Sequence, residues 1–168
     1  MSNINIDLLI QDKSWKSQKE INKKLMEEIF IMVLDNLKIS LCENEIEISI
    51  NLNNDKNIKD LNNKYRNKDK TTNVLTFSLY ENKKDVIRDL KKLPYICIGD
   101  IIFSYDTIKN EAEEQNKSFK NHFIHMLVHS YLHLFCYDHL TKKDETIMEN
   151  LEIEILKKMD INNPYLID

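Results

Sequence analysis

The sequence has little glycine, proline or cysteine: its 168 residues include one glycine, two prolines and three cysteines. The cysteines, Cys42, Cys97 and Cys136, are odd in number and scattered, which excludes the paired disulfide framework that small secreted proteins use. A reducing cytosol fits best. Because the scarce glycine and proline accompany abundant Asn, Lys and Ile, we interpret them as a base-composition bias with little functional weight.

Long apolar runs and export signals are also missing. No stretch approaches the roughly 20 apolar residues of a membrane span. The N-terminus has no basic segment followed by an apolar run, as a secretory signal would. We therefore expect a cytoplasmic protein with no membrane partner.

The net charge of −4 gives no reason to expect a nucleic-acid binder, but the charges are unevenly distributed. Acidic residues gather toward the C-terminal half, whereas cations are concentrated between residues 56 and 70. Such clustering permits a basic wall along one cleft, although a solvated charged helix is the commoner explanation. The cations of this cluster are Lys56, Lys59, Lys64, Arg66, Lys68 and Lys70.

The pattern of apolar residues predicts strands and helices that alternate early, with helices dominating late. Alternation predicts half-buried strands at residues 4–8 and 46–52. Between them, apolar residues recur every four positions in an amphipathic helix that begins near Ser17. A short helix is predicted at 58–65, after the second of these strands. The more continuous apolar strands at 74–80 and 95–104 are typical of central strands.

The rest of the chain predicts one connection and three helices. Residues 81–94 are charged, which indicates an exposed, mobile connection without a functional role. Helices are predicted at 105–115, 118–135 and 144–159. With 42% hydrophobic residues, the chain predicts a single domain spanning residues 1–168. The predicted fold class is α+β (α/β-like), with a mixed sheet of about four strands covered by helices.

Three histidines are spaced as ligands of one divalent metal ion: His129, His133 and His139. On a helix, residues four apart lie on the same face, so His129 and His133 can direct two nitrogens at one point. Five residues then separate His133 from His139, which is enough for the helix to end and for the third ligand to arrive from the following turn. Three imidazoles suit Zn²⁺ and leave a fourth position for water, as in catalytic zinc sites.

Two other interpretations of these histidines remain open. They could be ordinary polar residues on a buried helix, or they could form a structural zinc site closed by Cys136, Asp138 or His125. The helix at residues 119–135 is apolar around most of its circumference, yet His122 and His125 lie on the same stripe as His129 and His133. A buried stripe of imidazoles needs partners, so we expect His122 and His125 to line the cleft or to form hydrogen bonds around the site.

The spacing H-x-x-x-H-x-x-x-x-x-H is shared with the metzincin proteases, whose general base is a glutamate at the position of Ser130. Proteolysis is therefore disfavoured. Residues 125–139 instead resemble the YbeY family of bacterial metal-dependent endoribonucleases, and the resemblance extends over essentially the whole chain. Its further parts are the Arg66-centred segment 66–77, Gly99-Asp100-Ile101, Met148 with Glu152, and Pro164-Tyr165.

The resemblance implies a zinc-dependent endoribonuclease, specific for single strands, that acts in maturation of the 16S rRNA 3′ end and in ribosome quality control. It implies one Zn²⁺ per chain held by His129, His133 and His139, with Arg66 projecting into the metal-containing cleft and acting with His129 in catalysis. Its implied partners are ribosomal RNA, the small ribosomal subunit, a small-subunit ribosomal protein and an Era-type GTPase. Two alternatives are a non-catalytic ribosome-assembly factor with a structural metal and a zinc hydrolase for another substrate class.

The sequence differs from the family pattern at five positions near the predicted site. Ser130 and Cys136 replace glycines, and a non-glycine residue at a helix end is expected to strain the turn or to shift it. In the Arg66 segment, other residues replace proline, aspartate and proline, so we expect a less rigid loop. Those residues are Thr71, Asn73 and Ser78.

Overall fold

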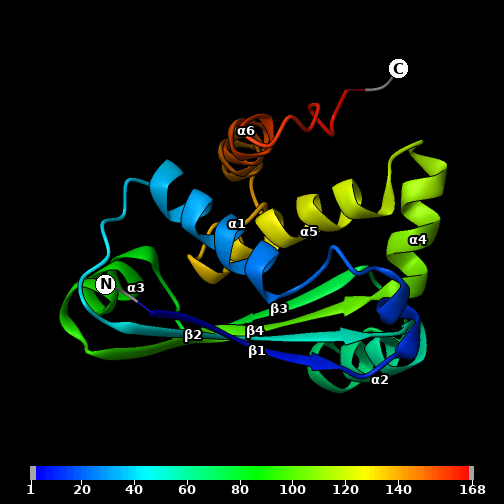
Figure 1. Ribbon diagram of the computed structural model, residues 1–168, viewed down its shortest axis with the longest axis horizontal. Coiled ribbons are helices and arrows are strands. Elements are labelled where there is room, and N and C mark those ends of the chain that lie inside the picture. The colour runs from blue at the N-terminus through cyan, green and yellow to red at the C-terminus, as the bar shows by residue number, and fades with distance from the viewer. Residues whose placement is uncertain (1–2, 167–168) are drawn as a thin grey trace.

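A four-stranded mixed sheet forms one layer of the structure, a computed structural model that describes residues 3–166 (Figure 1). The strands are β1 (Asn3–Ile10), β2 (Glu45–Asn53), β3 (Val74–Ser78) and β4 (Tyr95–Ser104). They are arranged in the order β1-β2-β4-β3, with β1, β2 and β4 parallel and β3 antiparallel to β4. The predicted mixed sheet of about four strands is thus confirmed.

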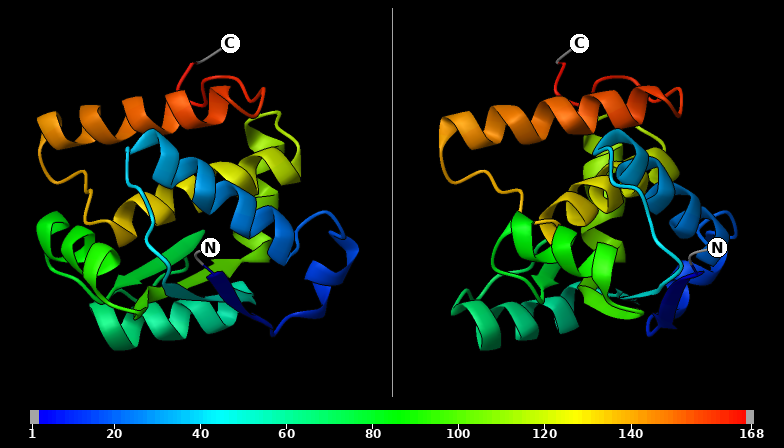
Figure 2. Two further views of the ribbon diagram at one scale, coloured as in Figure 1. Left: turned by 60° about the vertical axis from the view of Figure 1, so that its left-hand side comes forward. Right: turned by 90° about the vertical axis from the view of Figure 1, so that its left-hand side faces the viewer.

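Helices cover the two faces of the sheet unequally (Figures 1 and 2). One face carries α1 (Lys23–Asn36) and α5 (Phe119–Leu134), and α6 (Lys142–Lys157) lies beyond them as an outer layer. On the opposite face, α2 (Asp55–Arg66) covers part of the sheet. The remaining helices, α3 (Lys83–Lys92) and α4 (Tyr105–Glu114), flank the sheet near opposite ends of its strands.

The main core lies between the sheet and the α1/α5 layer. In β2 the alternate residues Ile46, Ile48, Ile50 and Leu52 are buried, as the alternating pattern predicts. Helix α5 is apolar around most of its circumference because it packs against β3, α1, α4 and α6. The prediction of a central buried helix is therefore confirmed. Within residues 3–166, no helix combines the length and apolar character needed to cross a bilayer.

The start of the first long helix and the position of β3 in the sheet both differ from the predictions. The first long helix begins at Lys23 rather than near Ser17, because Asn22 caps it by accepting a hydrogen bond from the Leu25 amide. A separate 3₁₀ helix, Lys13–Ser17, precedes it. Strand β3 is an edge strand, whereas β2 and β4 are central. Its continuous apolar character arises because α2 and α5 cover its two faces.

The segment predicted as an exposed, mobile connection, residues 81–94, instead contains α3. Asn82 caps this helix at the Asp85 amide, and its own side chain donates to the Asp85 carboxylate. Val86 and Leu90 are four residues apart, so they lie on one face of the helix and are fully buried. The high charge of the other face hid this two-residue apolar stripe.

The single glycine, Gly99, lies where the sheet and α5 approach closely. It pairs with Ser78 in the β3–β4 register. A Cβ atom at this position would be 2.2 Å from the carbonyl oxygen of Phe77 and 2.8 Å from Cδ2 of Leu134. Only a residue without a side chain fits here, because the nearer obstacle is backbone and cannot rotate away.

Candidate metal centre

The three predicted histidines lie together at the C-terminal end of α5 and in the loop that follows it. One nitrogen from each of His129, His133 and His139 lies within 4.8 Å of the others. His129 and His133 come from successive turns of α5, and the helix then ends in a Schellman motif. In it, the Tyr137 amide donates to the Leu132 carbonyl and the Cys136 amide donates to the His133 carbonyl. This turn directs His139 back toward the helix.

Hydrogen bonds orient both helical imidazoles so that their Nε2 atoms face one point. Nδ1 of His133 lies 2.8 Å from the carbonyl oxygen of Tyr137, so this nitrogen carries the proton and donates it. Nδ1 of His129 lies 2.5 Å from Oε1 of Glu152 and donates to that carboxylate. Both Nε2 atoms are then acceptors, which is the form that binds metal.

The donor set fits a divalent cation. The two Nε2 atoms are 3.0 Å apart, close to the roughly 3.3 Å expected for two nitrogens bound at about 2.0–2.1 Å to a tetrahedral zinc. Two lone pairs at this distance repel each other unless a cation lies between them. Burial, and then the neighbouring His129, lower the pKa of His133 to about 4, so this imidazole is neutral at neutral pH. A metal ion fits this arrangement better than a shared proton.

Glu152 is the residue of the site whose role sequence reasoning missed. It projects from α6, is fully buried, and has both oxygens engaged. Oε1 accepts from His129, while Oε2 accepts from the Tyr165 hydroxyl and lies 3.6 Å from Nε2 of His125. Burial opposes its ionisation, but the hydrogen bonds from His125 and His129 outweigh burial and lower the pKa of Glu152 to about 2. Glu152 therefore orients His129 as a buried carboxylate rather than accepting protons from solvent.

A signal for Glu152 was present in the sequence. Glu152 is four residues after Met148 and three before Ile155, both of which are buried. A glutamate within such an apolar stripe faces the interior and needs a partner there. Tyr165 belongs to the same site, because its hydroxyl donates a hydrogen bond to the Glu152 carboxylate.

Of the other two imidazoles of the stripe, that of His125 forms a hydrogen bond beside the site, as expected, whereas that of His122 bonds outside it. His125 lies 3.4 Å from the Tyr165 hydroxyl. His122 lies farther away and pairs with Glu111 of α4 at 2.6 Å. The pKa of Glu111 is lowered, because the hydrogen bonds from His122 and Asn73 outweigh the opposing effect of burial. These contacts extend a polar line along α5 away from the metal centre.

The residues considered as a closing fourth ligand point elsewhere. Cys136 donates its thiol to the Tyr80 carbonyl oxygen at 3.3 Å, and Asp138 accepts from the Leu140 amide at 3.2 Å. His125 faces Glu152 and Tyr165. In residues 3–166, the candidate metal group contains the three histidines and none of these residues. Cys136 has φ of +65°, so the turn keeps the conformation that glycine favours despite the cysteine side chain.

A cavity of about 220 Å³ opens beside His129 and His139. Met148, Glu152 and Tyr165 also line it. It gives a small molecule or water access to the side of the histidine cluster that faces α6. Ser130, at the position of the metzincin base, is fully buried and its hydroxyl has no hydrogen-bond partner in the described chain. The site therefore lacks the carboxylate that peptide hydrolysis of that type requires.

Arg66 lies at the end of α2 against the edge strand β3. Its Nη2 donates to the Thr76 carbonyl oxygen at 3.0 Å, and its guanidinium lies 5.5 Å from the centre of the Phe77 ring. It does not line the 220 Å³ cavity. Two residues farther along β3, the Ser78 hydroxyl donates to the Leu134 carbonyl, next to His133. Strand β3 thus contacts Arg66 through Thr76 and the histidine end of α5 through Ser78.

The three residues that differ from the family pattern in the Arg66 segment each form a side-chain hydrogen bond. Thr71 donates to Asp55 at 3.0 Å, Asn73 donates to Glu111 at 3.0 Å, and Ser78 donates to the Leu134 carbonyl at 3.1 Å. These bonds attach the segment to α2, α4 and α5. They hold the loop by contacts that the sequence pattern did not predict.

The fold and the site define a class: an α+β protein with a candidate metal centre of three histidines on a buried helix and the turn after it. Residues 9–160 match the sequence model of the family described as Endoribonuclease YbeY. The chain is 39% identical over 162 residues to Endoribonuclease YbeY of Bartonella bacilliformis, covering 96% of this chain and 97% of that protein. The chain therefore belongs to the YbeY family, as the sequence motifs indicated.

A solved structure shows the same fold. The solution structure of TM1509 from Thermotoga maritima superimposes with a TM-score of 0.53 at 24% identity, over 98% of this chain and 97% of that one. This likeness supports the overall fold described above.

Proposed function

We propose that this protein is a zinc-dependent endoribonuclease that cleaves single-stranded RNA, with one Zn²⁺ held by His129, His133 and His139. The observation that carries the proposal is the group of three imidazoles, two of them oriented through Nδ1 so that their lone pairs converge. When bound, zinc supplies Lewis-acid chemistry, by polarising a phosphoryl oxygen or by lowering the pKa of a water molecule.

The protein side chains bind and orient the RNA and the metal ligands. Arg66 uses one of its five N–H donors on the Thr76 carbonyl, which leaves donors for a phosphate group. Lys83 lies 3.7 Å from the centre of the Tyr137 ring and adds a cation near the loop that carries His139. The backbone of an RNA strand following the β3 edge would therefore meet cations on its way to the histidines.

The biological substrate in this proposal is ribosomal RNA. We place the activity in maturation of the 16S rRNA 3′ end and in ribosome quality control, in the cytoplasm. The small ribosomal subunit, one of its proteins and an Era-type GTPase are the proposed partners. Membership of the YbeY family supports this assignment.

Cleavage assays on purified protein test the activity. Zinc-loaded protein is expected to cut single-stranded RNA in preference to duplex, and a chelator should abolish cutting until zinc is restored. His133→Ala should lower the rate at least about 100-fold, because even outer partners of metal ligands contribute about 10- to 100-fold. Metal content, measured by elemental analysis, should fall in parallel.

Arg66 is tested against the other arginine of the chain. Arg66→Ala should slow cleavage while zinc content stays unchanged. The matched control is Arg88→Ala, because Arg88 is half-exposed on α3 and is engaged with Asp85 and Asp89. Cleavage that survives in both Arg66→Ala and His133→Ala would indicate a contaminating nuclease. A folded, metal-loaded protein without cleavage would favour a binding role in ribosome assembly.

A further inference from the structure

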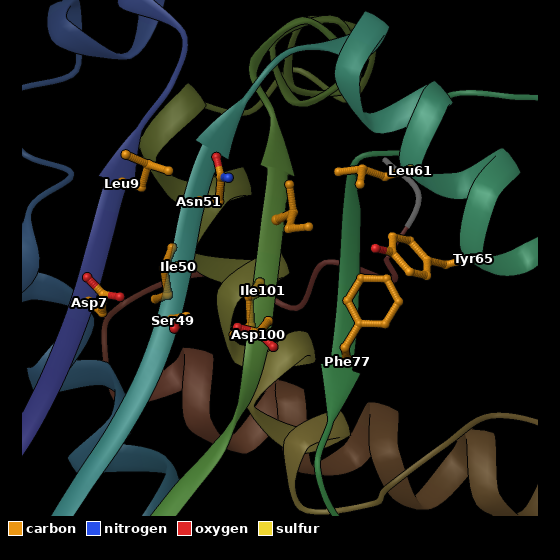
Figure 3. A pocket seen from close by; sticks show the side chains of 11 residues that line it. Asp7, Leu9, Ser49, Ile50, Asn51, Leu61, Tyr65, Phe77, Asp100 and Ile101 are labelled. Carbon is orange, nitrogen blue, oxygen red and sulfur yellow. The ribbon is translucent and has the colours of Figure 1, made fainter.

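A cavity with a volume of about 440 Å³ lies on the opposite face of the sheet from α5 (Figure 3). One wall is aromatic: Tyr65 of α2 and Phe77 of β3 lie side by side, with ring centres 5.8 Å apart. The floor is polar. In the sheet register, Phe77 pairs with Asp100, Asp100 with Ser49, and Ser49 with Asp7. With strands about 4.8 Å apart, this row spans about 14 Å.

The polar groups of the floor are mainly hydrogen-bond acceptors. Asp7 and Asp100 are exposed carboxylates. Asn51, two residues after Ser49 and on the same face of β2, donates its side-chain amide to Gln11. Its Oδ1 is buried without a partner among the described residues. A ligand that fits this floor brings donors, such as amino groups, and does not bring an anion.

The rim beside the aromatic wall is positive. Nζ of Lys64 lies 5.1 Å from the centre of the Tyr65 ring, and the Arg66 guanidinium lies 5.5 Å from that of Phe77. Tyr65 is 60% exposed, so its ring is accessible to a ligand. Cations at the rim repel a basic peptide but attract a phosphate. Aromatic rings next to a positive groove are the features that bind single-stranded nucleic acid.

We infer that this cavity binds one nucleobase of the RNA strand, with the base against Tyr65 and Phe77 and its phosphate at the Lys64/Arg66 rim. The inference rests on the proposed function and names a second contact on the same strand. Arg66 donates to Thr76 of β3, and two residues farther along the same strand Ser78 donates to Leu134, at the histidine end of α5. The cavity favours adenine, cytosine or guanine over uracil, because the first three carry an exocyclic amino group for Asp100, whereas uracil offers only its ring N3–H.

Binding of labelled hexanucleotides tests the inference independently of cleavage. Fluorescence anisotropy is measured on full-length protein in chelator, where the proposed cleavage cannot proceed. Hexa-adenylate and hexacytidylate are expected to bind more tightly than hexauridylate. Tyr65→Leu should weaken hexa-adenylate binding by about 5- to 100-fold, the usual effect of losing one stacking ring. Tyr65→Phe, which keeps the ring, should retain binding.

Two further variants separate the cavity from general effects. Tyr95→Leu is the matched control, because Tyr95 is an exposed tyrosine like Tyr65 but lies outside the cavity. Tyr95 is on β4, and its hydroxyl donates to the Glu47 carboxylate. It should bind hexa-adenylate like the wild type. Asp100→Asn should reduce the preference for adenine over uracil, because an amide can donate to uracil.

Specific outcomes would overturn the inference. Folded Tyr65→Leu protein with unchanged affinity for hexa-adenylate would do so, as would equal affinities of wild-type protein for the adenine and uracil hexamers. A lysine-rich peptide that binds this face while no hexamer does would assign the cavity to a protein partner instead. If zinc-loaded wild-type protein fails to cleave RNA but the Tyr65 effect holds, the binding inference stands and the proposed nuclease activity fails.

Discussion

At the scale of single residues, Glu152 links the outer helix to the metal centre. Its carboxylate accepts hydrogen bonds from Nδ1–H of His129 and from the Tyr165 hydroxyl, so one buried side chain fixes both the tautomer and the orientation of the His129 imidazole. Such carboxylate–histidine pairs raise the basicity of the metal-binding nitrogen. The strength of the metal site therefore depends on α6 as well as on α5.

Glu152→Gln is predicted to lower zinc affinity about 10- to 100-fold, because the neutral amide stabilises the His129 tautomer less than a carboxylate does. Competition with a chromophoric chelator measures this directly. Glu154→Gln is the matched control, since Glu154 is exposed on the same helix. Wild-type zinc affinity in the Glu152 variant would show that the contact with His129 does not matter for the metal.

The three histidines were predictable because their spacing encodes local geometry, a helical i, i+4 pair and a ligand after the helix end. The environment of Arg66 was not predictable in the same way. Its contacts with Thr76 and Phe77 join a helix end to a strand that begins several residues later, and only the tertiary fold sets that distance.

At the scale of elements, Asp55 anchors the start of α2, the helix that carries the basic cluster. Its carboxylate accepts hydrogen bonds from the hydroxyls of Ser104 and Thr107, at the junction of β4 and α4, and from that of Thr71, in the loop before β3. Burial opposes ionisation of Asp55, yet these hydrogen bonds outweigh it and lower its pKa. The ionised carboxylate thus holds α2 against the sheet.

Because of Asp55, the stability of the fold is predicted to decrease as the pH is lowered. A carboxyl whose pKa is lower in the folded than in the unfolded protein stabilises the fold above the unfolded value of about 3.9 and loses that contribution as the pH falls below it. Urea unfolding at pH 7 and pH 3 should show a smaller acid destabilisation in Asp55→Asn than in the wild type. An unchanged pH dependence would contradict this role.

The errors at this scale have physical causes. Helix α3 was missed because charged residues outnumber the two buried side chains on its inner face, although the Asn82 cap was visible in the sequence. Strand β3 was placed in the centre because an edge strand covered on both faces has the same apolar character as a central one. How far the two faces of a strand are buried and whether both of its edges are paired are separate properties. The composition of a strand indicates only the burial of its faces.

At the scale of the whole molecule, the candidate metal centre joins α5 to the loop that leads into α6. His129 and His133 belong to the helix, whereas His139 belongs to the loop, and Glu152 attaches α6 to the same site. Metal bound here connects the inner and outer helical layers. Binding should therefore stabilise the fold as a whole.

Zinc is predicted to raise the thermal unfolding midpoint of the metal-free protein. At a free concentration 100 times Kd, binding to the native state alone adds about 2.7 kcal/mol to the free energy of unfolding. Scanning calorimetry with and without zinc measures the shift. The increase should disappear in His139→Ala, which removes the ligand on the loop. An equal shift in that variant would mean that zinc binds elsewhere.

The close packing around Gly99 also affects the candidate metal centre. The atoms that would collide with a methyl group there belong to Phe77, whose neighbour Thr76 receives Arg66, and to Leu134, which directly follows His133. A side chain at position 99 would therefore displace β3, Leu134 or both. Such a displacement would shift Arg66 relative to the histidines without altering any of the residues proposed to take part in the reaction.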